Sequence, residues 1–173
     1  MVVKINPTPG QKKMLTTLLA GGVSLAAAVS GVFITGPSEG LKHVPYKDVT
    51  GVATTCFGHT GSIQNKKYTY DECLDLMVKD LSKADKDVSS VIHVPLNVHQ
   101  RASLIDFDYN VGYTNFSKST MVKMFNEGKY VEGCNQLMRW VYADGHKYKG
   151  LEKRRNLELQ WCLGKVEIDN GIK

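Results

Sequence analysis

EGLKHVPYKDVTGVAT, residues 39–54, is the stretch around which the rest of this sequence is organised. It carries Glu39, followed by Asp48 and Thr54. Two carboxyl groups that are close in sequence but differ in local setting can serve separately as acid and base, as hydrolysis of a glycosidic bond requires. The spacing alone does not establish this chemistry, because Glu39 also fits as a favourable negative charge at the start of a helix.

The residues around this stretch predict a short helix followed by a small β lobe. Residues 37–43 favour a helix start, and residues 44–60 favour β structure, with side chains that alternate along 52–57. Residues 48–51, DVTG, predict a tight turn that folds the β region back on itself. The catalytic candidates would therefore lie at the edge of this lobe.

A long helix is predicted directly after the β lobe. Thr69 and Glu72 form a capping box, and apolar residues then recur near helical spacing as far as Ile92. The helix is expected to cover residues 70–91, which is long enough to bridge two lobes, and Pro95 follows it. Further helices are expected over residues 97–112, 119–126, 130–142 and 150–163, with Val131, Leu137, Trp140 and Val141 on the apolar side of the third and a turn at 144–145 after it.

These elements predict an α+β protein that is mainly α-helical. A small antiparallel β lobe and a helical lobe would be joined by the long connecting helix, with a cleft between the lobes. Such a cleft is a natural place for a polymer substrate, and Glu39 and the β lobe would line it.

The composition indicates a globular chain with an excess of positive charge. Its 173 residues suffice for one ordinary domain, and they carry a net charge of +5 with a pI of about 9.0. Basic charge favours anionic polymers. The sequence lacks the aromatic motifs, zinc-finger spacing and basic runs that would favour nucleic acid. The anionic bacterial envelope stays a candidate partner, and a solvated basic surface without a partner explains the charge equally well.

Four cysteines are present, namely Cys56, Cys73, Cys134 and Cys162. An even number suits two disulfides in an exported chain, and three pairings are possible. We favour Cys56 with Cys73 and Cys134 with Cys162, because each pair falls within one compact region of the chain. Zinc is an alternative, since His59 is close to two cysteines, but no second close pair completes a familiar site. We therefore expect no metal.

The N-terminal segment is uncharged between Lys13 and Glu39. Residues 14–36, MLTTLLAGGVSLAAAVSGVFITG, are long enough to span a bilayer as a helix. Positive charge before them predicts that this flank lies in the cytoplasm. Because glycine, alanine, serine and threonine dilute the larger apolar residues, the segment is only weakly hydrophobic and should insert marginally.

Four interpretations compete for this segment. It could be a cleavable signal peptide with small residues at 26–28, a permanent anchor, a transient anchor that exports the domain and later leaves the membrane, or a buried helix of a soluble protein. The glycines weigh against a permanent anchor, and the basic flank and missing polar face weigh against a soluble helix. We therefore take residues 1–36 as a signal-anchor segment and residues 37–173 as the catalytic domain.

The string E-G-L-x-x-x-x-Y-x-D-x-x-G-V-x-T-x-C-x-G-H-T, residues 39–60, closely resembles the phage-type lysozymes, or muramidases. The resemblance continues in YNVG at 109–112 and GLEKRR at 150–155, and it covers roughly residues 37–164. The weakly hydrophobic N-terminus resembles that of the signal-arrest-release endolysins of lambdoid phages. In those enzymes a transient anchor holds the inactive protein at the inner membrane until collapse of the membrane potential releases it.

The resemblance implies a lysozyme-like fold and a lytic activity. It implies hydrolysis, with inversion, of the β-1,4 bond between N-acetylmuramic acid and N-acetylglucosamine in bacterial peptidoglycan, without metal or organic cofactor. Glu39 would be the general acid, and Asp48 with Thr54 would orient or activate the attacking water. Tyr46 matches a cleft tyrosine of the family and would contact substrate, although packing within the β lobe explains it equally well.

The resemblance also suggests two supporting contacts. His59 matches a family histidine that pairs with an aspartate, and Asp80 on the long helix is the candidate partner. Either Arg154 or Arg155 would form an ion pair with Glu39, and the sequence does not choose between them. The remaining histidines, His43, His93, His99 and His146, are expected at the surface.

The segment before Glu39 predicts that enzyme activity is controlled by whether this segment lies in the membrane or in the folded domain. Residues 1–36 contain no cysteine, so we do not expect the exchange of disulfide partners that activates some release endolysins. While residues 14–36 lie in the bilayer, Glu39 is too close to lipid to face Asp48. Release would let the segment fold against the domain and carry Glu39 into the cleft.

The expected location is the host inner membrane, with the N-terminus in the cytoplasm, and then the periplasm. The protein is expected to be a monomer.

Two other functions stay open. One is a peptidoglycan-binding protein without catalysis, and the other is a lytic transglycosylase, which cuts the same bond without water and would not need Asp48 or Thr54.

Overall fold

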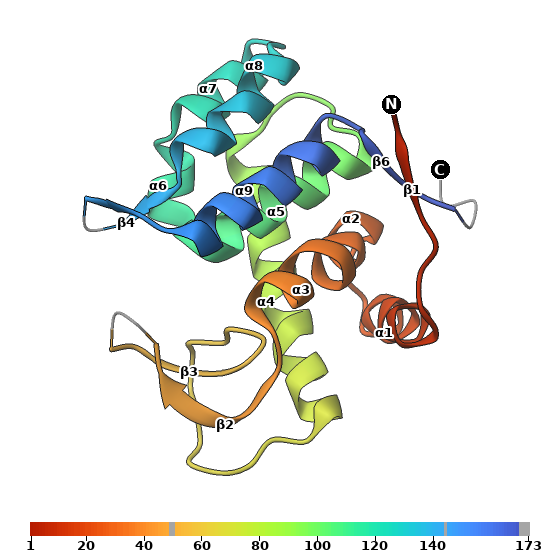
Figure 1. The fold of residues 1–173 in the computed structure, drawn as a ribbon, viewed down its shortest axis with the longest axis vertical. Helices are drawn as coiled ribbons and strands as arrows, with labels where there is room; N and C mark the ends of the chain where they lie inside the picture. Colours follow the sequence, from red (N-terminus) through yellow and green to blue (C-terminus); the bar gives the residue numbers. More distant parts are fainter. Residues whose placement is uncertain (49–50, 144, 170–173) are drawn as a thin grey trace.

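The long helix α4 (Tyr70–Val91) joins a helical lobe to a small β lobe (Figure 1). The computed structural model describes residues 1–48, 51–143 and 145–169. The predicted α+β architecture and the bounds of α4 are confirmed. The capping box forms as expected, because the Thr69 hydroxyl accepts from the Glu72 backbone N–H and the Glu72 carboxylate accepts from the Thr69 N–H.

The β lobe is built on an antiparallel hairpin of β2 (Lys42–Lys47) and β3 (Ala53–Cys56). The register places Tyr46 opposite Thr54. Of the turn predicted at 48–51, residues 49 and 50 lie outside the described residues, and the Gly51 N–H donates to the Asp48 carbonyl over 3.0 Å. The expected helix at 37–43 ends at Glu39, because the chain turns into β2 soon after Gly40, whose φ is +68°.

The helical lobe surrounds α5 (Val98–Val111), which packs against α4 and α9. The other elements of this lobe are α6 (Tyr113–Ser117), α7 (Thr120–Asn126), α8 (Tyr130–Asn135), the 3₁₀ helix η2 (Gln136–Arg139), β4 (Tyr142–Ala143), β5 (His146–Lys147) and α9 (Lys149–Cys162). Both α5 and α9 lie close to their predicted positions, and each ends at a glycine with positive φ within two residues. The short helix α6 was not predicted.

The helix predicted over 130–142 is shorter than expected. It ends at Asn135, after which the chain tightens into η2. Val131 is 59% exposed, which contradicts its predicted apolar role, because α8 instead turns Gly133 and Cys134 inward. Gly133 is close to the Phe125 ring, since a Cβ atom there would lie 2.7 Å from Cδ2 of that ring. Leu137 and Val141 are buried and Trp140 is half-buried, as predicted, and Asp144 of the predicted turn lies outside the described residues.

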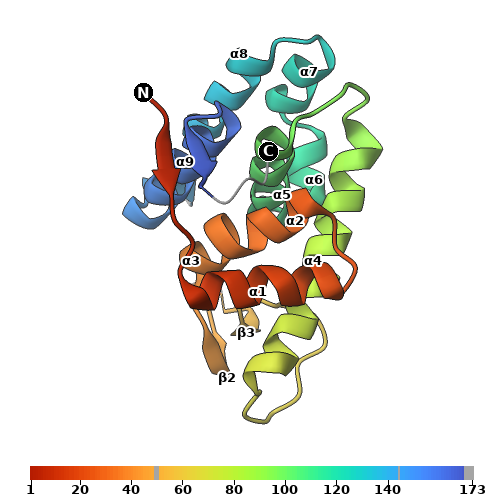
Figure 2. The ribbon, with the colours of Figure 1, turned by 90° about the vertical axis from the view of Figure 1, so that its right-hand side faces the viewer.

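The N-terminal segment folds into the domain. It forms β1 (Val3–Ile5), α1 (Pro9–Ala20), α2 (Leu25–Ser30), the π-helical turn η1 (Gly31–Thr35) and α3 (Gly36–Glu39). Figure 2 shows α1 lying across α4, with α2 beside α5. Residues 26–35 are all buried. None of the helices in the described part of the chain combines the length and apolar character needed to cross a membrane.

Two glycines let this segment pack closely on α4. A Cβ atom on Gly21 would lie 2.8 Å from Val78 Cγ2, and one on Gly31 would lie 2.7 Å from Leu81 Cδ1. Gly31 also faces Leu18 of α1, at 2.9 Å by the same measure. The glycines that weaken the hydrophobicity of this segment are therefore contact points in the folded protein.

The two ends of the chain pair with each other. β1 lies parallel to β6 (Val166–Ile168), with Val3 opposite Val166 and Ile5 opposite Ile168. This pairing was not predicted, because it joins segments that are far apart in sequence and carry no local signal. It ties the N-terminal segment to the last described strand.

Both predicted disulfides are confirmed, between Cys56 and Cys73 and between Cys134 and Cys162. Because the sulfurs of the first pair bond to each other, these two cysteines are not zinc ligands. Two of the four remaining histidines are not at the surface. His43 is half-buried at 2.8 Å from the Tyr68 carbonyl, and His99 is half-buried with its ring edge against Trp161; His93 and His146 are exposed as predicted.

Candidate active site

Glu39 lies at the junction of the two lobes. It is the last residue of α3, and its side chain is 22% exposed. A Cβ atom on Gly58 would lie only 2.7 Å from Glu39 Oε2, so the carboxylate rests against the backbone of the β lobe. Gly58 has φ +86°, which favours glycine on backbone grounds as well. The helical N-terminal segment thus delivers this acid directly to the β lobe.

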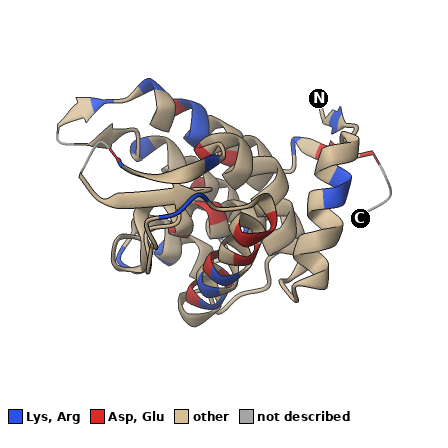
Figure 3. Ribbon diagram, turned by 90° about the horizontal axis from the view of Figure 1, so that it is seen from below, with Lys and Arg blue, Asp and Glu red and all other residues tan. Residues whose placement is uncertain are grey.

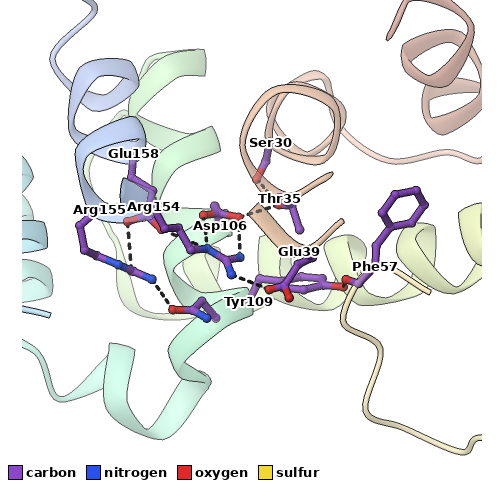
Figure 4. A network of polar contacts seen from close by, with 10 residues as sticks. Ser30, Thr35, Glu39, Phe57, Asp106, Tyr109, Arg154, Arg155 and Glu158 are labelled. Carbon is purple, nitrogen blue, oxygen red and sulfur yellow. Dashed lines mark hydrogen bonds and ion pairs between the residues drawn. The ribbon is translucent and has the colours of Figure 1, made fainter. Parts of the chain in front are cut away.

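Arg154 of α9 holds the other side of the Glu39 carboxylate. Its Nη1 donates to Glu39 Oε1 over 2.5 Å. The same guanidinium donates from Nε and Nη2 to the two carboxylate oxygens of Asp106, each over 2.9 Å (Figure 4). Of the two predicted arginines, the structure therefore selects Arg154 as the partner of Glu39.

Arg155 points to a different side of α9. Its Nη2 donates to Asn110 Oδ1, its Nη1 lies 3.0 Å from Glu158 Oε2, and its guanidinium carbon is 4.8 Å from the Phe107 ring centre. Arg155 and Glu158 are both fully buried. Burial raises the pKa of Glu158 well above its usual range, against the opposing effect of Arg155.

Asp48 and Thr54 lie on the β hairpin. Asp48 follows the end of β2, and its Oδ1 accepts from the Val52 N–H over 2.9 Å. Thr54 is buried on β3, and its hydroxyl donates to the Val52 carbonyl over 3.0 Å. Both side chains are therefore fixed by the short loop that connects the strands.

Tyr46 connects the two carboxylates electrostatically. It is exposed on β2 opposite Thr54. Burial of the phenol raises its pKa, and the negative charges of Glu39 and Asp48 raise it further. Tyr46, Asp48 and Thr54 therefore share the hairpin, and Glu39 contacts Gly58 just after β3.

The predicted contact between His59 and Asp80 is confirmed. His59 Nδ1 lies 2.7 Å from Asp80 Oδ2 on α4. Burial raises the pKa of Asp80, and the contact with His59 opposes this effect. The backbone of His59 also bridges to Thr55, so the pair anchors the loop after β3 to the long helix.

Tyr109 lies beside Glu39 (Figure 4). Its hydroxyl donates to the Phe57 carbonyl over 2.7 Å, linking α5 to the β lobe. Burial raises its pKa, with further contributions from Asp80 and Glu39. Beside it lies a cavity of about 190 Å³ between the lobes, lined by Gly58, Thr60, Asp80, Lys83, Ala84, Asp108, Tyr109, Gly112 and Tyr113.

Sequence reasoning missed Asp106, which is fully buried behind Arg154. A signal was present, because Asp106 and Asp108 are charged residues within the apolar run ASLIDFDY at 102–109. A carboxyl group in such a run is rarely fully buried without a partner.

The charges along α4 are arranged differently from the buried charges around Arg154. Seen from the β lobe, acidic and basic residues intermix along this helix (Figure 3).

An acid at a helix end against the β lobe, with a second acid and a threonine on the hairpin of that lobe, is an arrangement typical of lysozyme-like glycoside hydrolases. A family model described as Phage lysozyme matches residues 36–158, and the chain belongs to this family as a lytic endolysin. The SAR-endolysin of Enterobacteria phage PA-2 is 41% identical over 162 residues, which cover 90% of this chain and 96% of the relative. The SAR-endolysin of Enterobacteria phage P21 is 40% identical with the same coverage.

A solved structure shares the fold. The crystal structure of the active form of P1 phage endolysin Lyz matches with a TM-score of 0.74 at 23% identity. The match covers 88% of this chain and 93% of that one. The fold found here is therefore that of a known lysozyme-like enzyme.

Proposed function

We propose that this endolysin hydrolyses the β-1,4 bond between N-acetylmuramic acid and N-acetylglucosamine in peptidoglycan, with Glu39 as the general acid. The supporting observation is the position of Glu39. Its carboxylate lies against Gly58 at the lobe junction and is held by Arg154, next to the hairpin that carries Asp48 and Thr54. An acid and a second carboxylate around one open position are what glycoside hydrolysis needs.

The proposed reaction is a single displacement with inversion. Glu39 gives its proton to the glycosidic oxygen as the bond from that oxygen to the sugar C1 breaks. Water attacks C1 from the opposite face while Asp48 accepts its proton. The Thr54 hydroxyl, which donates to the Val52 carbonyl, keeps lone pairs that can accept a hydrogen bond from this water. Tyr46 would contact the sugar at the rim of the site.

The substitution Glu39→Gln tests the acid. It should lower turnover by roughly 100- to 10,000-fold, because an amide cannot supply the proton. The rate is measured as loss of turbidity of permeabilised Gram-negative cells, with folding checked by circular dichroism. Glu127→Gln, at an exposed site after α7, is the matched control and should be fully active.

Analysis of the fragments by mass spectrometry separates the rival functions. Hydrolysis leaves a reducing N-acetylmuramic acid end. Anhydro ends would identify a lytic transglycosylase, and binding without fragments would identify a non-catalytic protein. A folded Glu39→Gln variant that still clears peptidoglycan would overturn the assignment of the acid.

We also propose that residues 14–36 serve first as a transient membrane anchor, with the N-terminus in the cytoplasm. Two observations support this: the segment has no charge, and the relatives carry the name SAR-endolysin. As one straight helix, residues 14–36 would be about 35 Å long, enough for the hydrocarbon core of a bilayer. In the folded domain the same residues are interrupted between Ala20 and Leu25. The anchored and folded arrangements therefore exclude each other.

Fractionation of expressing cells tests the anchor. Before depolarisation the full-length protein should be in the membrane fraction, and after addition of an uncoupler it should appear, uncleaved and monomeric, in the periplasm. Appearance in the periplasm from the start, with a shortened N-terminus, would identify a cleaved signal peptide instead. A chain without residues 1–36, exported by an ordinary signal peptide, should be inactive, and full activity would contradict the refolding step.

A further inference from the structure

Asp106 is a fully enclosed charge next to the site. It lies on α5 with no exposed surface, and its two oxygens accept three hydrogen bonds. Arg154 Nε donates to Oδ2, Arg154 Nη2 donates to Oδ1, and the Thr35 hydroxyl donates to Oδ1 over 2.7 Å. A carboxylate is rarely buried this deeply without such partners. Its position therefore depends on both α9 and the N-terminal segment.

The first effect of Asp106 is geometric. Two parallel hydrogen bonds to one carboxylate fix the plane of a guanidinium group. With Nε and Nη2 of Arg154 occupied in this way, Nη1 is the nitrogen that reaches Glu39 Oε1. Asp106 thus determines where Arg154 holds the acid.

The second effect is electrostatic. A lone arginine beside a general acid favours the ionised form of that acid, which cannot donate a proton. The negative charge of Asp106 balances the positive charge of Arg154, so Glu39 faces a guanidinium whose charge is already paired. The carboxylate of Asp106 stays ionised, because Arg154 outweighs the effect of burial and holds its pKa at about 2.

Other ionisable groups also face Glu39. Tyr46 and Asp48 lie on the β lobe, and Tyr109 lies on α5. On α9, Arg155 and Glu158 form their own buried pair at 3.0 Å, and Glu158 Oε1 lies 3.7 Å from Arg154 Nε. The charge of Asp106 also raises the pKa of Glu158, so a change at Asp106 alters the balance of charge around Arg154 at both carboxyl groups.

Thr35 brings the N-terminal segment into this arrangement. It is buried on η1, four positions before Glu39, and its hydroxyl lies 3.3 Å from the Ser30 hydroxyl. We propose that Asp106 is a positioning residue that fixes and neutralises Arg154 for Glu39, and that the Thr35 hydroxyl makes this depend on docking of the N-terminal segment. This inference rests on the proposed role of Glu39 as general acid.

Asp106→Asn tests the electrostatic part, since the amide keeps the shape and loses the charge. We expect the alkaline limb of the pH profile of kcat/KM to move down by about one pH unit or more. Above that limb the activity should fall roughly tenfold for each unit of the shift. KM should change little, because Asp106 is buried away from the substrate. An unchanged profile in a folded variant would overturn the proposal.

Substitutions at Thr35 test whether the position of Asp106 depends on docking of the N-terminal segment. They also test the positioning role of Asp106 if Asp106→Asn does not fold. Thr35→Val removes the hydroxyl and should reduce kcat severalfold at constant KM, whereas Thr35→Ser keeps the hydroxyl and should restore it. Thr16→Val is the matched control, because Thr16 is exposed and its hydroxyl donates to the Lys12 carbonyl within α1. Equal losses in the valine and serine variants would overturn the link.

These outcomes are distinct from a failure of the proposed function. If Glu39→Gln remains active, the assignment of the acid is wrong whatever happens at Asp106. If Glu39→Gln is inactive but the Asp106 and Thr35 variants behave like the wild type, only the positioning role fails.

Discussion

Two buried aspartates on α5, Asp106 and Asp108, lie two positions apart and meet opposite surroundings. Asp106 faces α9 and the N-terminal segment, and although burial raises its pKa, Arg154 lowers it to about 2. Asp108 faces α4, where burial and the negative charge of Asp87 raise its pKa to about 7. One of its oxygens, Oδ1, makes no hydrogen bond within the described residues.

The comparison shows that the fold stabilises the ionised form of Asp106 and disfavours the ionised form of Asp108. The two groups also respond to pH in opposite directions. The contribution of Asp106 to stability is present above the unfolded pKa of about 3.9 and is lost as the pH falls towards 2. The contribution of protonated Asp108 is present below about pH 4 and is lost as the pH rises through 7.

Removal of Arg154, the partner of Asp106, should leave both aspartates without a buried counter-ion. Of the changes considered, it should lower the free energy of unfolding most. Arg154→Met keeps the volume and leaves Asp106 buried without a counter-ion, so the free energy of unfolding at pH 7 should fall by about 3–5 kcal/mol. Urea unfolding followed by circular dichroism measures this. Arg139→Met, at an exposed arginine, should cost far less, and equal losses in the two variants would show that Asp106 does not depend on Arg154.

Removal of the charge of Asp108 should have an effect of the opposite sign, one that appears only as the pH rises. Asp108→Asn eliminates the cost of ionising a buried group, so the variant should gain stability over the wild type as the pH rises. The gain should grow between about pH 4 and pH 7 by up to about 1.4 kcal/mol per unit and then level off. Urea unfolding at several pH values tests this, and a difference that does not vary with pH would contradict the assignment of Asp108.

Removal of the charge of Lys83 should increase the difference in pKa between Asp106 and Asp108, and its effect on stability should be the smallest of the three. Its ammonium group pairs with Asp87 at 2.5 Å and lowers the pKa of Asp108. Lys83→Met should move the pH dependence of stability upward by less than one unit, at a cost below about 1 kcal/mol, because the side chain is exposed. Lys86→Met, on the same helix, provides the control, and a downward movement would contradict the role of Lys83.

Local signals predicted much of the fold. The capping box at Thr69 and the helical spacing after it defined α4, and the spacing of the cysteines indicated both disulfides. The end of α8 at Asn135 was missed because packing of Gly133 against Phe125 overrode the apolar pattern. The pairing of β1 with β6 was missed because the contact is formed only after the whole chain has folded.

The residues of the candidate site also fall into two groups, those that a local sequence pattern predicted and those that it did not. Glu39, Asp48 and Thr54 lie in one continuous stretch, so their pattern was visible in the sequence. Asp106 acts through Thr35 and Arg154, which come from opposite ends of the chain. No local periodicity could reveal that contact, although a charged residue in an apolar run marked the position.

The close approach of Gly21 and Gly31 to α4 has a consequence for the timing of lysis. An apolar side chain at either position would make the membrane form of the proposed anchor more stable and would collide with Val78 or Leu81 in the folded form. Both effects delay escape from the bilayer. Substitutions at these two glycines would therefore change when the host cell bursts, and with it the number of phage released, without altering any group at the active site.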